Sequence, residues 1–482
     1  MLALILILIP LIGSLLLFSL RGSNAGVSKN VALITALVEF VIAAYAFLSF
    51  DSQTIVEVKY AWMKDLKINF HLGIDGISLL MVTLTGFLVP LIVLSTFKYS
   101  YKKHESFYSL ILLAQAALMG VFMAKDIFLF YFFYEVALIP VYFLAALWGG
   151  ANAPRITFKM FVYTMFGSLF MLVAIVYLYI KASSANIQEL YTAAKFLTPT
   201  SQNLLFWAFF VAFAIKMPVL PFHTWQPDTY SESPTPATML LSGLLSKMGV
   251  YGLIRILLPL APVGVANYGF IAMVLSIIGL IYGSVIAIQQ NNIKRLIAYS
   301  SFAHMGLMAA GVLSGTLSGI QGALLQMVAH GINAVGLFFI VKIIYDRTKT
   351  RDLHSLGGIT QKTPALSIYF MIIMLGSVAL PLTNGFVGEF LLLKGVFDKN
   401  MWLGGIAGLT IILGAVYMLR LMQRSMFGET NAVTTKFSDV KGTEIAVLLP
   451  IAAVVLLMGI FPNVFLKITE PAVNSLLQLI HP

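Results

Sequence analysis

The stretch YFFYEVALIP, residues 131–140, places one glutamate, Glu135, within a run of aromatic and aliphatic residues. No other charged residue lies within eight positions of Glu135 on either side. The apolar run extends over 126–148, which is about the 20 residues that a helix needs to span a bilayer. An ionised carboxylate is costly in a bilayer core even after local relaxation. The stretch therefore predicts a membrane-spanning helix in which Glu135 has a specific role.

The composition of the whole chain matches this stretch. Its 482 residues are 60% hydrophobic and 10% charged, whereas soluble domains carry roughly 25% charged residues. Apolar windows recur along the chain and leave no room for a soluble domain. We therefore expect an all-α polytopic membrane protein, a single membrane domain over 1–482 with about fourteen transmembrane helices. The expected helices lie at 2–20, 28–50, 73–97, 105–122, 126–148, 157–180, 202–220, 235–258, 264–286, 291–314, 319–345, 365–393, 401–427 and 440–465.

Charge and cysteine content exclude several functions. The formal net charge of +11 does not indicate nucleic-acid binding, because the basic residues are spread over short loops. The chain has no cysteine, so it forms no disulfide and supplies no thiolate to an iron–sulfur cluster. The first apolar run, 1–20, is expected to be a retained helix, because it lacks a positively charged leading region and a clear cleavage site.

The basic residues are distributed unevenly between the two sets of loops. Loops with odd numbers, counted from the N-terminus, hold most of them, and the opposite loops hold fewer. Because positively charged loops stay in the cytoplasm, both termini are predicted to lie on the periplasmic side. The odd-numbered loops hold Arg21, Lys29, Lys98, Lys102, Lys103, Arg155, Lys294, Arg295, Arg347, Lys349, Arg351, Lys362, Arg420, Arg424, Lys436 and Lys441.

Six ionisable residues are predicted to lie within the membrane. Ionisable groups at this depth mark ion pathways. Each of the six can gain or lose a proton, and no arginine, which keeps its proton, is among them. Lysine and histidine in particular change protonation state readily when they are buried. The six residues are Glu135, Lys216, Lys247, His304, His330 and Glu389.

This series predicts a proton relay, although each member also has a simpler interpretation. A single buried histidine is often a structural residue with its hydrogen bonds satisfied. One buried Glu–Lys pair can be a packing clamp. A series of acid, base and imidazole groups along the chain favours the relay over these interpretations.

Two expected helices are broken beside members of the series. FAIKMPVLPF (213–222) has two prolines after Lys216, and VALPLTNGFVGEF (378–390) has Pro381 and Gly385 before Glu389. Proline interrupts helical hydrogen bonds, and broken helices at membrane depth occur inside protein or around a watery cavity. Ordinary proline kinks are the alternative. Paired interruptions in two halves of a chain are typical of transporters with inverted repeats and mark their ion site.

Three further features lie outside the relay. Asp75 in GIDG is expected to cap the start of its helix. Glu39 falls within an apolar window without a motif that explains it. The loop 221–234, with His223 and Trp225, is expected to form either a structured cap over a half-channel or a tight interfacial loop with an aromatic anchor.

Five segments resemble the antiporter-like subunits of respiratory complex I, a family related to the Mrp-type sodium/proton antiporter subunits. The segments span most of the chain, so the resemblance does not rest on one short motif. It implies the fourteen-helix fold with two inverted five-helix repeats, over 105–258 (helices 4–8) and 264–427 (helices 9–13). The segments are LGIDGISLL (72–80), FYEVALIPVYFLAALWGG (133–150), AIKMPVLPFHTWQPDTYSESPTPATMLLSGLLSKMGVYGLIR (214–255), KRLIAYSSFAHMG (294–306) and NGFVGEF (384–390).

Carried over by position, the resemblance implies a role for each of the six residues. Glu135 and Lys216 match the family's ion pair, Lys247 matches its central lysine, and the two histidines match its connecting residues. Glu389 in the broken twelfth helix resembles the M-type branch, because the other branches have a lysine there. The implied activity is proton translocation through this relay, coupled to electron transfer elsewhere in an NADH-quinone oxidoreductase.

The resemblance also implies the setting of the chain. It is expected to be a non-redox subunit of the translocase, multi-pass in a bacterial inner membrane, between L-type and N-type antiporter-like chains. It is expected to bind no metal, cofactor or nucleic acid itself. FMN, iron–sulfur clusters and quinone are expected in other subunits of the complex.

Several alternatives stay open at this point. An Mrp-type sodium/proton antiporter subunit has the same fold, but Glu389 argues against it. A D-type chain of a photosynthetic complex I-like enzyme is similar to the M-type branch. A substrate carrier would need a central pocket suited to one solute, and a passive scaffold would not need a lysine as deep as Lys247.

Overall fold

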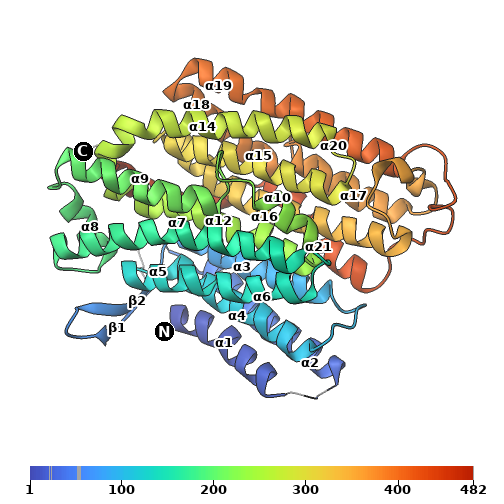
Figure 1. The fold of residues 1–482 in the computed structure, drawn as a ribbon, viewed down its shortest axis with the longest axis horizontal. Helices are drawn as coiled ribbons and strands as arrows, with labels where there is room; N and C mark the ends of the chain where they lie inside the picture. The colour runs from blue at the N-terminus through green and yellow to red at the C-terminus, as the bar shows by residue number, and fades with distance from the viewer. Residues whose placement is uncertain (21, 23, 52–55, 481–482) are drawn as a thin grey trace.

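The computed structural model describes residues 1–20, 22, 24–51 and 56–480. Its long helices run roughly side by side in one bundle (Figure 1). Within the described residues, twelve helices are long and apolar enough to cross a membrane. The two other expected windows, 202–220 and 365–393, are interrupted helices, so the expectation of fourteen spans stays a prediction. The all-α polytopic fold class is confirmed.

The helices and strands have the following bounds. The N-terminal part comprises α1 (Leu2–Ser19), α2 (Ala25–Leu48), β1 (Val56–Met63), β2 (Ile68–Ile74) and α3 (Gly76–Leu94). The middle part comprises α4 (His104–Met123), α5 (Ile127–Val136), α6 (Leu138–Trp148), α7 (Ala153–Ala182), α8 (Ile187–Ala194), α9 (Pro199–Lys216), α10 (Gln226–Glu232), α11 (Thr235–Leu240), η1 (Leu241–Leu245), α12 (Ser246–Gly252), η2 (Leu253–Leu257) and α13 (Leu258–Leu260). The last part comprises α14 (Pro262–Gln289), α15 (Ile293–Leu313), α16 (Leu317–Thr348), η3 (Leu353–Ser355), η4 (Ile359–Gln361), α17 (Pro364–Ser377), α18 (Asn384–Lys399), α19 (Met401–Ala407), α20 (Leu409–Met426), α21 (Thr443–Ile460) and α22 (Asn463–Ile480).

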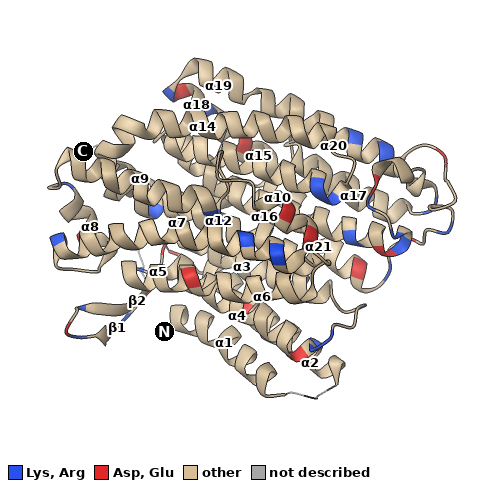
Figure 2. Cartoon of the chain, viewed as in Figure 1, with Lys and Arg blue, Asp and Glu red and all other residues tan. Residues whose placement is uncertain are grey.

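Both chain ends lie at one end of the bundle, together with the β1–β2 hairpin and α8 (Figure 1). Charged residues are sparse along the middle of the helices and gather toward the two ends (Figure 2). Arg21, one of the basic loop residues, lies outside the described residues. Termini at one end agree with the predicted topology, and the side of the membrane on which they lie stays a prediction.

Asp75 caps α3, as its position in GIDG predicted. Its carboxylate accepts hydrogen bonds from the backbone N–H groups of Ile77 and Ser78. The Ser78 hydroxyl in turn accepts a hydrogen bond from the Asp75 backbone N–H, which completes a capping box. These bonds satisfy donors that the first turn of a helix leaves free. The cap fixes the point at which the chain leaves β2 and enters the bundle.

One long buried segment, Thr235–Leu260, contains two π-helical turns. They are η1 and η2, and α12 lies between them. π-helical turns are rare and are found frequently at functional sites. Lys247 is the second residue of α12, so a buried lysine lies where the helical hydrogen-bond pattern changes twice.

Both predicted helix breaks are present. α9 ends at Lys216, and the chain continues in turns through Pro218 and Pro221 before α10 begins. Between α17 and α18, Ala379 and Leu382 adopt left-handed backbone conformations with φ of 60° and 70°. Residues with a side chain adopt this region rarely, at a cost of about 1–3 kcal/mol each. The packing around the second break therefore holds it in place against local strain.

Two elements lie largely between the expected helices. They are the antiparallel hairpin β1–β2, which spans Val56–Ile74, and α8 at Ile187–Ala194. An isolated two-stranded hairpin is marginally stable in water. Here Leu72 and Ile74 of β2 are buried against the helices, so the hairpin depends on tertiary contacts that periodicity in the sequence does not report.

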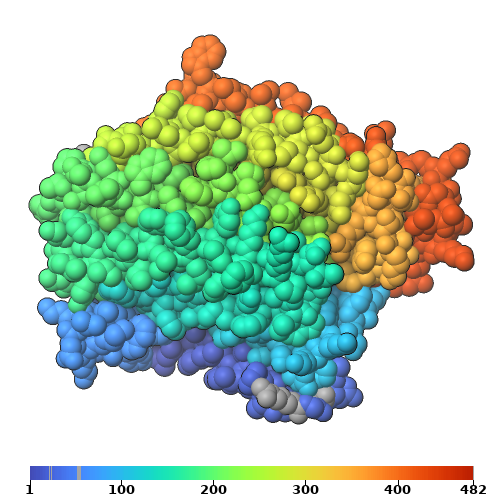
Figure 3. All heavy atoms as spheres, viewed as in Figure 1, coloured from blue at the N-terminus to red at the C-terminus, as the bar shows by residue number. Residues whose placement is uncertain are grey.

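The outer surface of the bundle is apolar. Figure 3 shows one long face as a continuous wall of side chains, with α7 in teal and α14 in yellow-green. Phe166 and Val173 of α7 are 58% and 70% exposed. Large exposed apolar areas are unusual on soluble monomers. This surface suits contact with lipid tails or with neighbouring membrane chains.

Gly249 lies where α12 packs closely on the end of α9. A methyl group added at this position should therefore disturb the packing of the two helices. A Cβ at Gly249 would lie 2.7 Å from both the Met217 Cβ and the Phe213 carbonyl oxygen. Gly249→Ala should therefore separate the helices and lower the free energy of unfolding by about 1–3 kcal/mol. Thermal unfolding in detergent measures this. Gly405→Ala is the matched control, because no atom lies within 4 Å of its added Cβ, and equal unfolding midpoints for the two variants would contradict the prediction.

Candidate functional site

Glu135 and Lys216 form the first part of the site. Glu135 is the penultimate residue of α5, which ends because Pro140 has no N–H group to pair with the Val136 carbonyl. Lys216 is the buried last residue of α9. The two charges interact through space, but in the described structure they make no direct ion pair. The Lys216 Nζ lies 4.8 Å from the centroid of the Tyr134 ring, a cation–π contact.

Lys247 is fully buried and makes all its polar contacts within the protein. Its Nζ donates a hydrogen bond to the Ser242 carbonyl oxygen in η1 and lies 3.4 Å from the Ser246 Oγ. It also lies 2.7 Å from Nδ1 of His330 in α16. None of these contacts goes to Lys216. The polar contacts of Lys247 therefore continue toward the second half of the chain.

The two histidines lie together beside Lys247. The ring centroids of His304 and His330 are 5.6 Å apart, in an edge-to-face arrangement. Both side chains are buried. Among the described residues neither ring nitrogen of His304 has a hydrogen-bond partner. His304 is therefore the point at which direct contacts along the series stop.

A narrow cavity continues from the histidines. Ser301 Oγ and Gln326 Oε1, both on its wall, have no hydrogen-bond partner among the described residues. The cavity has room for about one water molecule, and a buried water needs two to four polar partners of this kind. Its polar lining residues are Ser300, Ser301, His304, Gln326, His330, Asn333 and Ser377.

Tyr417 connects this cavity to Glu389. Ser300 donates a hydrogen bond of 3.1 Å to the Tyr417 hydroxyl. Tyr417, in α20, interacts electrostatically with Glu389 in α18. Glu389 is 3% exposed, and its Oε2 has no hydrogen-bond partner among the described residues. Ser300 and Tyr417 thus provide hydroxyl groups on the side of the cavity toward Glu389.

An amide pair fixes the broken helix that carries Glu389. Asn333 of α16 and Asn384, the first residue of α18, donate hydrogen bonds of 3.1 Å to each other. Asn384 also donates to the Ala329 carbonyl at 3.3 Å. Both asparagines are buried. This reciprocal pair holds the start of α18 against α16, one turn from Glu389.

The loop 221–234 is ordered and packed. The His223 ring stacks on Phe302 at 4.6 Å, and the Trp225 Nε1 donates to the Ile215 carbonyl at 2.9 Å. Asp228 makes a 3.0 Å ion pair with Arg295. These contacts tie the segment after the α9 break to α15 and to the end of α9 itself, as a structured cap requires.

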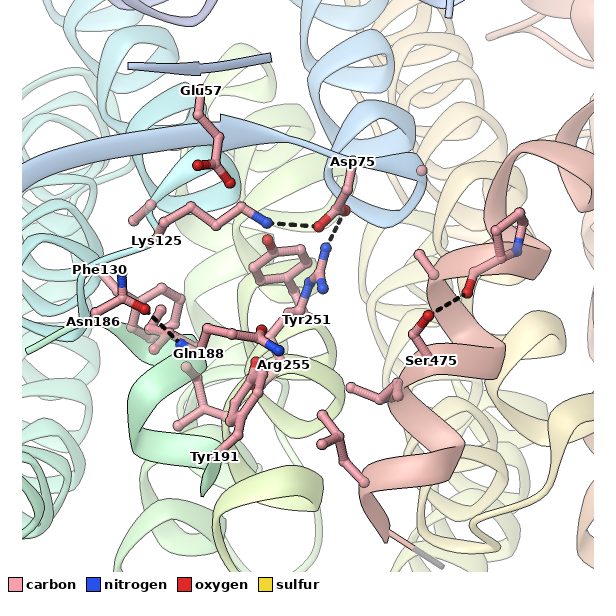
Figure 4. Close-up of a pocket in the computed structure, with 18 of the residues that line it drawn as sticks. Glu57, Asp75, Lys125, Phe130, Asn186, Gln188, Tyr191, Tyr251, Arg255 and Ser475 are labelled. Atoms are coloured by element: carbon pink, nitrogen blue, oxygen red, sulfur yellow. Dashed lines mark hydrogen bonds and ion pairs between the residues drawn. The ribbon is translucent and has the colours of Figure 1, made fainter. Parts of the chain in front are cut away.

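A separate pocket of about 910 Å³ lies at the hairpin end of the bundle, between β2, α8, η2 and α22. Figure 4 shows Asp75 in this pocket with Lys125 on one side and Arg255 on the other. The Lys125 Nζ lies 2.7 Å from Asp75, and Arg255 makes a direct ion pair with the same carboxylate. Burial alone would raise the pKa of Asp75, but the charges of Arg255 and Lys125 outweigh burial and hold it well below its usual range.

The six predicted residues thus fall into connected and unconnected parts. Lys247, His330 and His304 lie in one cluster. Tyr417, which accepts a hydrogen bond from Ser300 on the cavity wall, lies within electrostatic range of Glu389. Glu135 and Lys216 form a separate, spatially coupled pair. Tyr417 was not foreseen, because an uncharged tyrosine in an apolar helix has no distinctive signal. Asn384 was also missed, although its position in the NGFVGEF segment, as a polar residue next to the break, could have indicated it.

Comparisons with known proteins agree with the resemblance drawn from the sequence. A family model described as NADH:quinone oxidoreductase/Mrp antiporter, TM, matches residues 124–414. The chain is similar to NADH-quinone oxidoreductase subunit M of Rickettsia typhi, 39% identical over 453 residues that cover 93% of this chain and 91% of the relative. It matches a chain of respiratory complex I from Thermus thermophilus with a TM-score of 0.92 and 30% identity over 100% of both chains. A chain of the Mrp complex from Dietzia sp. matches with a TM-score of 0.86, over 99% of this chain and 52% of that one, at 18% identity, which shows the fold alone.

The Asp75 ion pairs predict a pH-dependent contribution to stability. Asp75→Asn keeps a helix cap but leaves Lys125 and Arg255 without their counter-charge, at a cost of about 2–3 kcal/mol, somewhat below the value for a fully buried pair. Because the folded-state pKa of Asp75 is depressed, the wild-type advantage should be complete above about pH 4 and fade as the pH falls further. Thermal unfolding in detergent at several pH values measures it.

The matched control for this prediction is Asp228→Asn. Asp228 pairs with Arg295, but both side chains are about one-third exposed or more. Its loss should change the free energy of unfolding by at most about 1 kcal/mol. An Asp75→Asn variant that is as stable as Asp228→Asn at neutral pH would contradict the prediction.

Proposed function

The chain belongs to the NADH:quinone oxidoreductase/Mrp antiporter membrane family, and on that premise we propose that it translocates protons through its Glu/Lys/His relay. It is an antiporter-like membrane-arm subunit of a multi-subunit membrane complex of the complex I kind. The name of its relatives, subunit M, supports the M-type branch over the Mrp-type and D-type alternatives. Glu389 supports the same choice against the Mrp type, because the resemblance implies a lysine at this position in that type.

One observation carries the proposal: the 2.7 Å contact between Lys247 Nζ and His330 Nδ1. A hydrogen bond between two basic nitrogens holds one shared proton, so one of the two groups must be neutral. A protonated Lys247 donates to a neutral His330, and a protonated Nδ1 of His330 donates to a neutral Lys247. The proton can therefore pass from lysine to histidine along a bond that already exists. A purely structural contact has no need of two groups that both titrate.

The Glu135–Lys216 pair is proposed to control the supply of protons to Lys247. When the pair closes to about 4 Å, an effective dielectric near 20 gives about 4 kcal/mol of attraction that favours a charged Lys216. When it opens, Lys216 has the Tyr134 ring beside it, and Ser168 lies near Glu135. The geometry resembles the opened arrangement. In it Lys216 is prepared to release its proton toward Lys247 through water.

Beyond His330 the path is proposed to run through His304 and an ordered water to Glu389. The histidine rings meet edge to face and share no hydrogen bond, so a water in the adjoining cavity is needed to complete the path. Ser300 and Tyr417 provide hydroxyl groups between the cavity and Glu389. Glu389 then acts as the last donor of this half.

The chain is proposed to do no redox chemistry itself. FMN, iron–sulfur clusters and quinone are assigned to other subunits, and L-type and N-type chains are proposed as the neighbours on either side. The chain is a multi-pass membrane protein, for which a bacterial inner membrane with both termini on the periplasmic side is proposed. The two inverted repeats, 105–258 and 264–427, stay a prediction.

The proposal is tested with Lys216→Ala in membranes that contain the whole complex. We expect NADH–quinone electron transfer and membrane acidification to fall together by at least about tenfold, which corresponds to about 1.4 kcal/mol in the barrier. Assembly should stay intact. Lys436→Met is the control, because Lys436 is exposed. Full rates in an assembled Lys216→Ala complex would make the pair a packing clamp and refute the proposal.

Tyr417→Phe tests the second half of the relay. The variant keeps the ring and removes the hydroxyl that accepts the Ser300 hydrogen bond. Proton translocation should slow by roughly threefold to tenfold, since one hydrogen bond contributes about 1 kcal/mol. Proton uptake by vesicles that carry the complex measures it. Tyr369→Phe, a partly exposed tyrosine of α17, is the control, and equal rates in the two variants would remove Tyr417 from the path.

A further inference from the structure

Glu39 is a buried acid that the relay does not use. It is the fifteenth residue of α2 and has no exposed surface. Within the described residues neither of its carboxylate oxygens has a hydrogen-bond partner. Gly86 of α3 packs closely on this part of α2, because a Cβ there would lie 3.0 Å from Ala43 Cβ and 3.4 Å from Phe40 Cα. The helix contact therefore keeps water away from the Glu39 side chain.

Among the described residues, no cation on the helices packed around Glu39 lies near enough to balance a negative charge. α1 and α3 contain no charged residue. Apart from tyrosines, the ionisable residues of α4 are His104 and Glu105 in its first turn. That of α2 besides Glu39 is Lys29, about 15 Å away along the helix. α22 meets α2 two turns further on, at Phe47, and its Lys467 and Glu470 are exposed. An ionised Glu39 would be an uncompensated buried charge, so the carboxyl group is neutral.

The register of α2 and α4 brings Gln115 level with Glu39. The two helices start side by side, because the Ser28 Oγ and the His104 Nδ1 are 3.0 Å apart. Further along, Thr35 of α2 and Leu112 of α4 both contact Gly13 of α1, so the helices run in the same direction. Glu39 and Gln115 each come eleven residues after the first contact, which is about three helical turns and returns to the same face.

Gln115 has the same unusual property as Glu39. It is fully buried, and neither its Oε1 nor its Nε2 has a hydrogen-bond partner among the described residues. Buried amides are almost always hydrogen-bonded. Two buried residues with four unpartnered polar atoms, two on each side chain, therefore lie at one level of the neighbouring helices α2 and α4.

We propose that Glu39 and Gln115 form a second proton-binding site. The two side chains are not bonded to each other in the described structure, and in the proposed site they turn toward each other, so that a protonated Glu39 carboxyl pairs with the Gln115 carboxamide through two hydrogen bonds. The carboxyl O–H donates to the Gln115 Oε1, and the Gln115 Nε2 donates to the carboxyl C=O. This arrangement satisfies all four atoms. An ionised Glu39 can only accept, which would leave the Gln115 Oε1 without a donor. The bound ligand is a proton, held apart from the relay in the N-terminal helices.

Infrared spectroscopy of the whole complex tests this pairing. Glu39→Gln should remove one band from the C=O region of protonated carboxylic acids, and that band should be present in the wild type at neutral and mildly alkaline pH. Gln115→Leu should keep the band and shift it to higher frequency, because the C=O loses a donated hydrogen bond. Glu189→Gln is the control: Glu189 is exposed on α8, and its loss should reduce the carboxylate bands alone.

Three results would overturn the inference. Loss of carboxylate bands in Glu39→Gln would show that Glu39 is ionised. If the carboxylic-acid band does not move in Gln115→Leu, the Glu39–Gln115 pair is excluded. This variant tests the pair even if Glu39→Gln fails to assemble. Disappearance of the acid band when sodium chloride replaces choline chloride at constant pH would assign the site to a metal cation. The relay variants should leave the band unchanged, so failure of the relay mechanism and failure of this site are distinguishable.

Discussion

The cost of an unbalanced charge in a lipid-surrounded bundle constrains every buried polar group in this protein. A lone ionised group at membrane depth is expensive, so each such group must pair, hydrogen-bond or become neutral. Lys247 satisfies this constraint with the Ser242 carbonyl, Ser246 and His330. His304 and Glu389 keep atoms without partners among the described residues. Those atoms lie along a single path, and they are where water and protons have to be accommodated.

The constraint explains why much of the site could be predicted from the sequence. A charged residue within an apolar window is visible in one dimension, and so is a proline next to it. The broken helices could therefore be predicted, and the six ionisable residues of the proposed relay could be singled out. Contacts between distant segments have no such signal. Asp75 was predicted as a helix cap, but its partner Arg255 lies 180 residues away. The π turns around Lys247 have no compositional mark, and the uncharged Tyr417 looks like an ordinary apolar-helix residue.

The helix breaks are maintained by packing and not by proline alone. Proline explains why α9 cannot continue beyond Lys216, but the second break also holds Ala379 and Leu382 in unfavourable backbone conformations. The reciprocal Asn333–Asn384 bonds join the new helix to α16 directly after this strained segment. Because α16 also carries His330, the same helix positions one member of the relay and anchors the helix of another. A shift of α16 would therefore move both ends of the second half together.

The proposed relay runs across the bundle. Lys247 and His330 belong to different long helices, and the contact between them runs across the bundle instead of along a helix axis. A single helix could carry a proton only by stacking groups at successive turns, but here the successive groups lie on α12, α16, α15 and α18. Lateral transfer needs no large movement of any helix, because each step joins neighbours that are already packed. It does require that only one proton lies between Lys247 Nζ and His330 Nδ1, so that one of the two nitrogens always accepts. The protonation states of Lys247 and His330 are therefore linked, and the proposed mechanism uses this link to carry a charge change at Lys216 onward to Glu389.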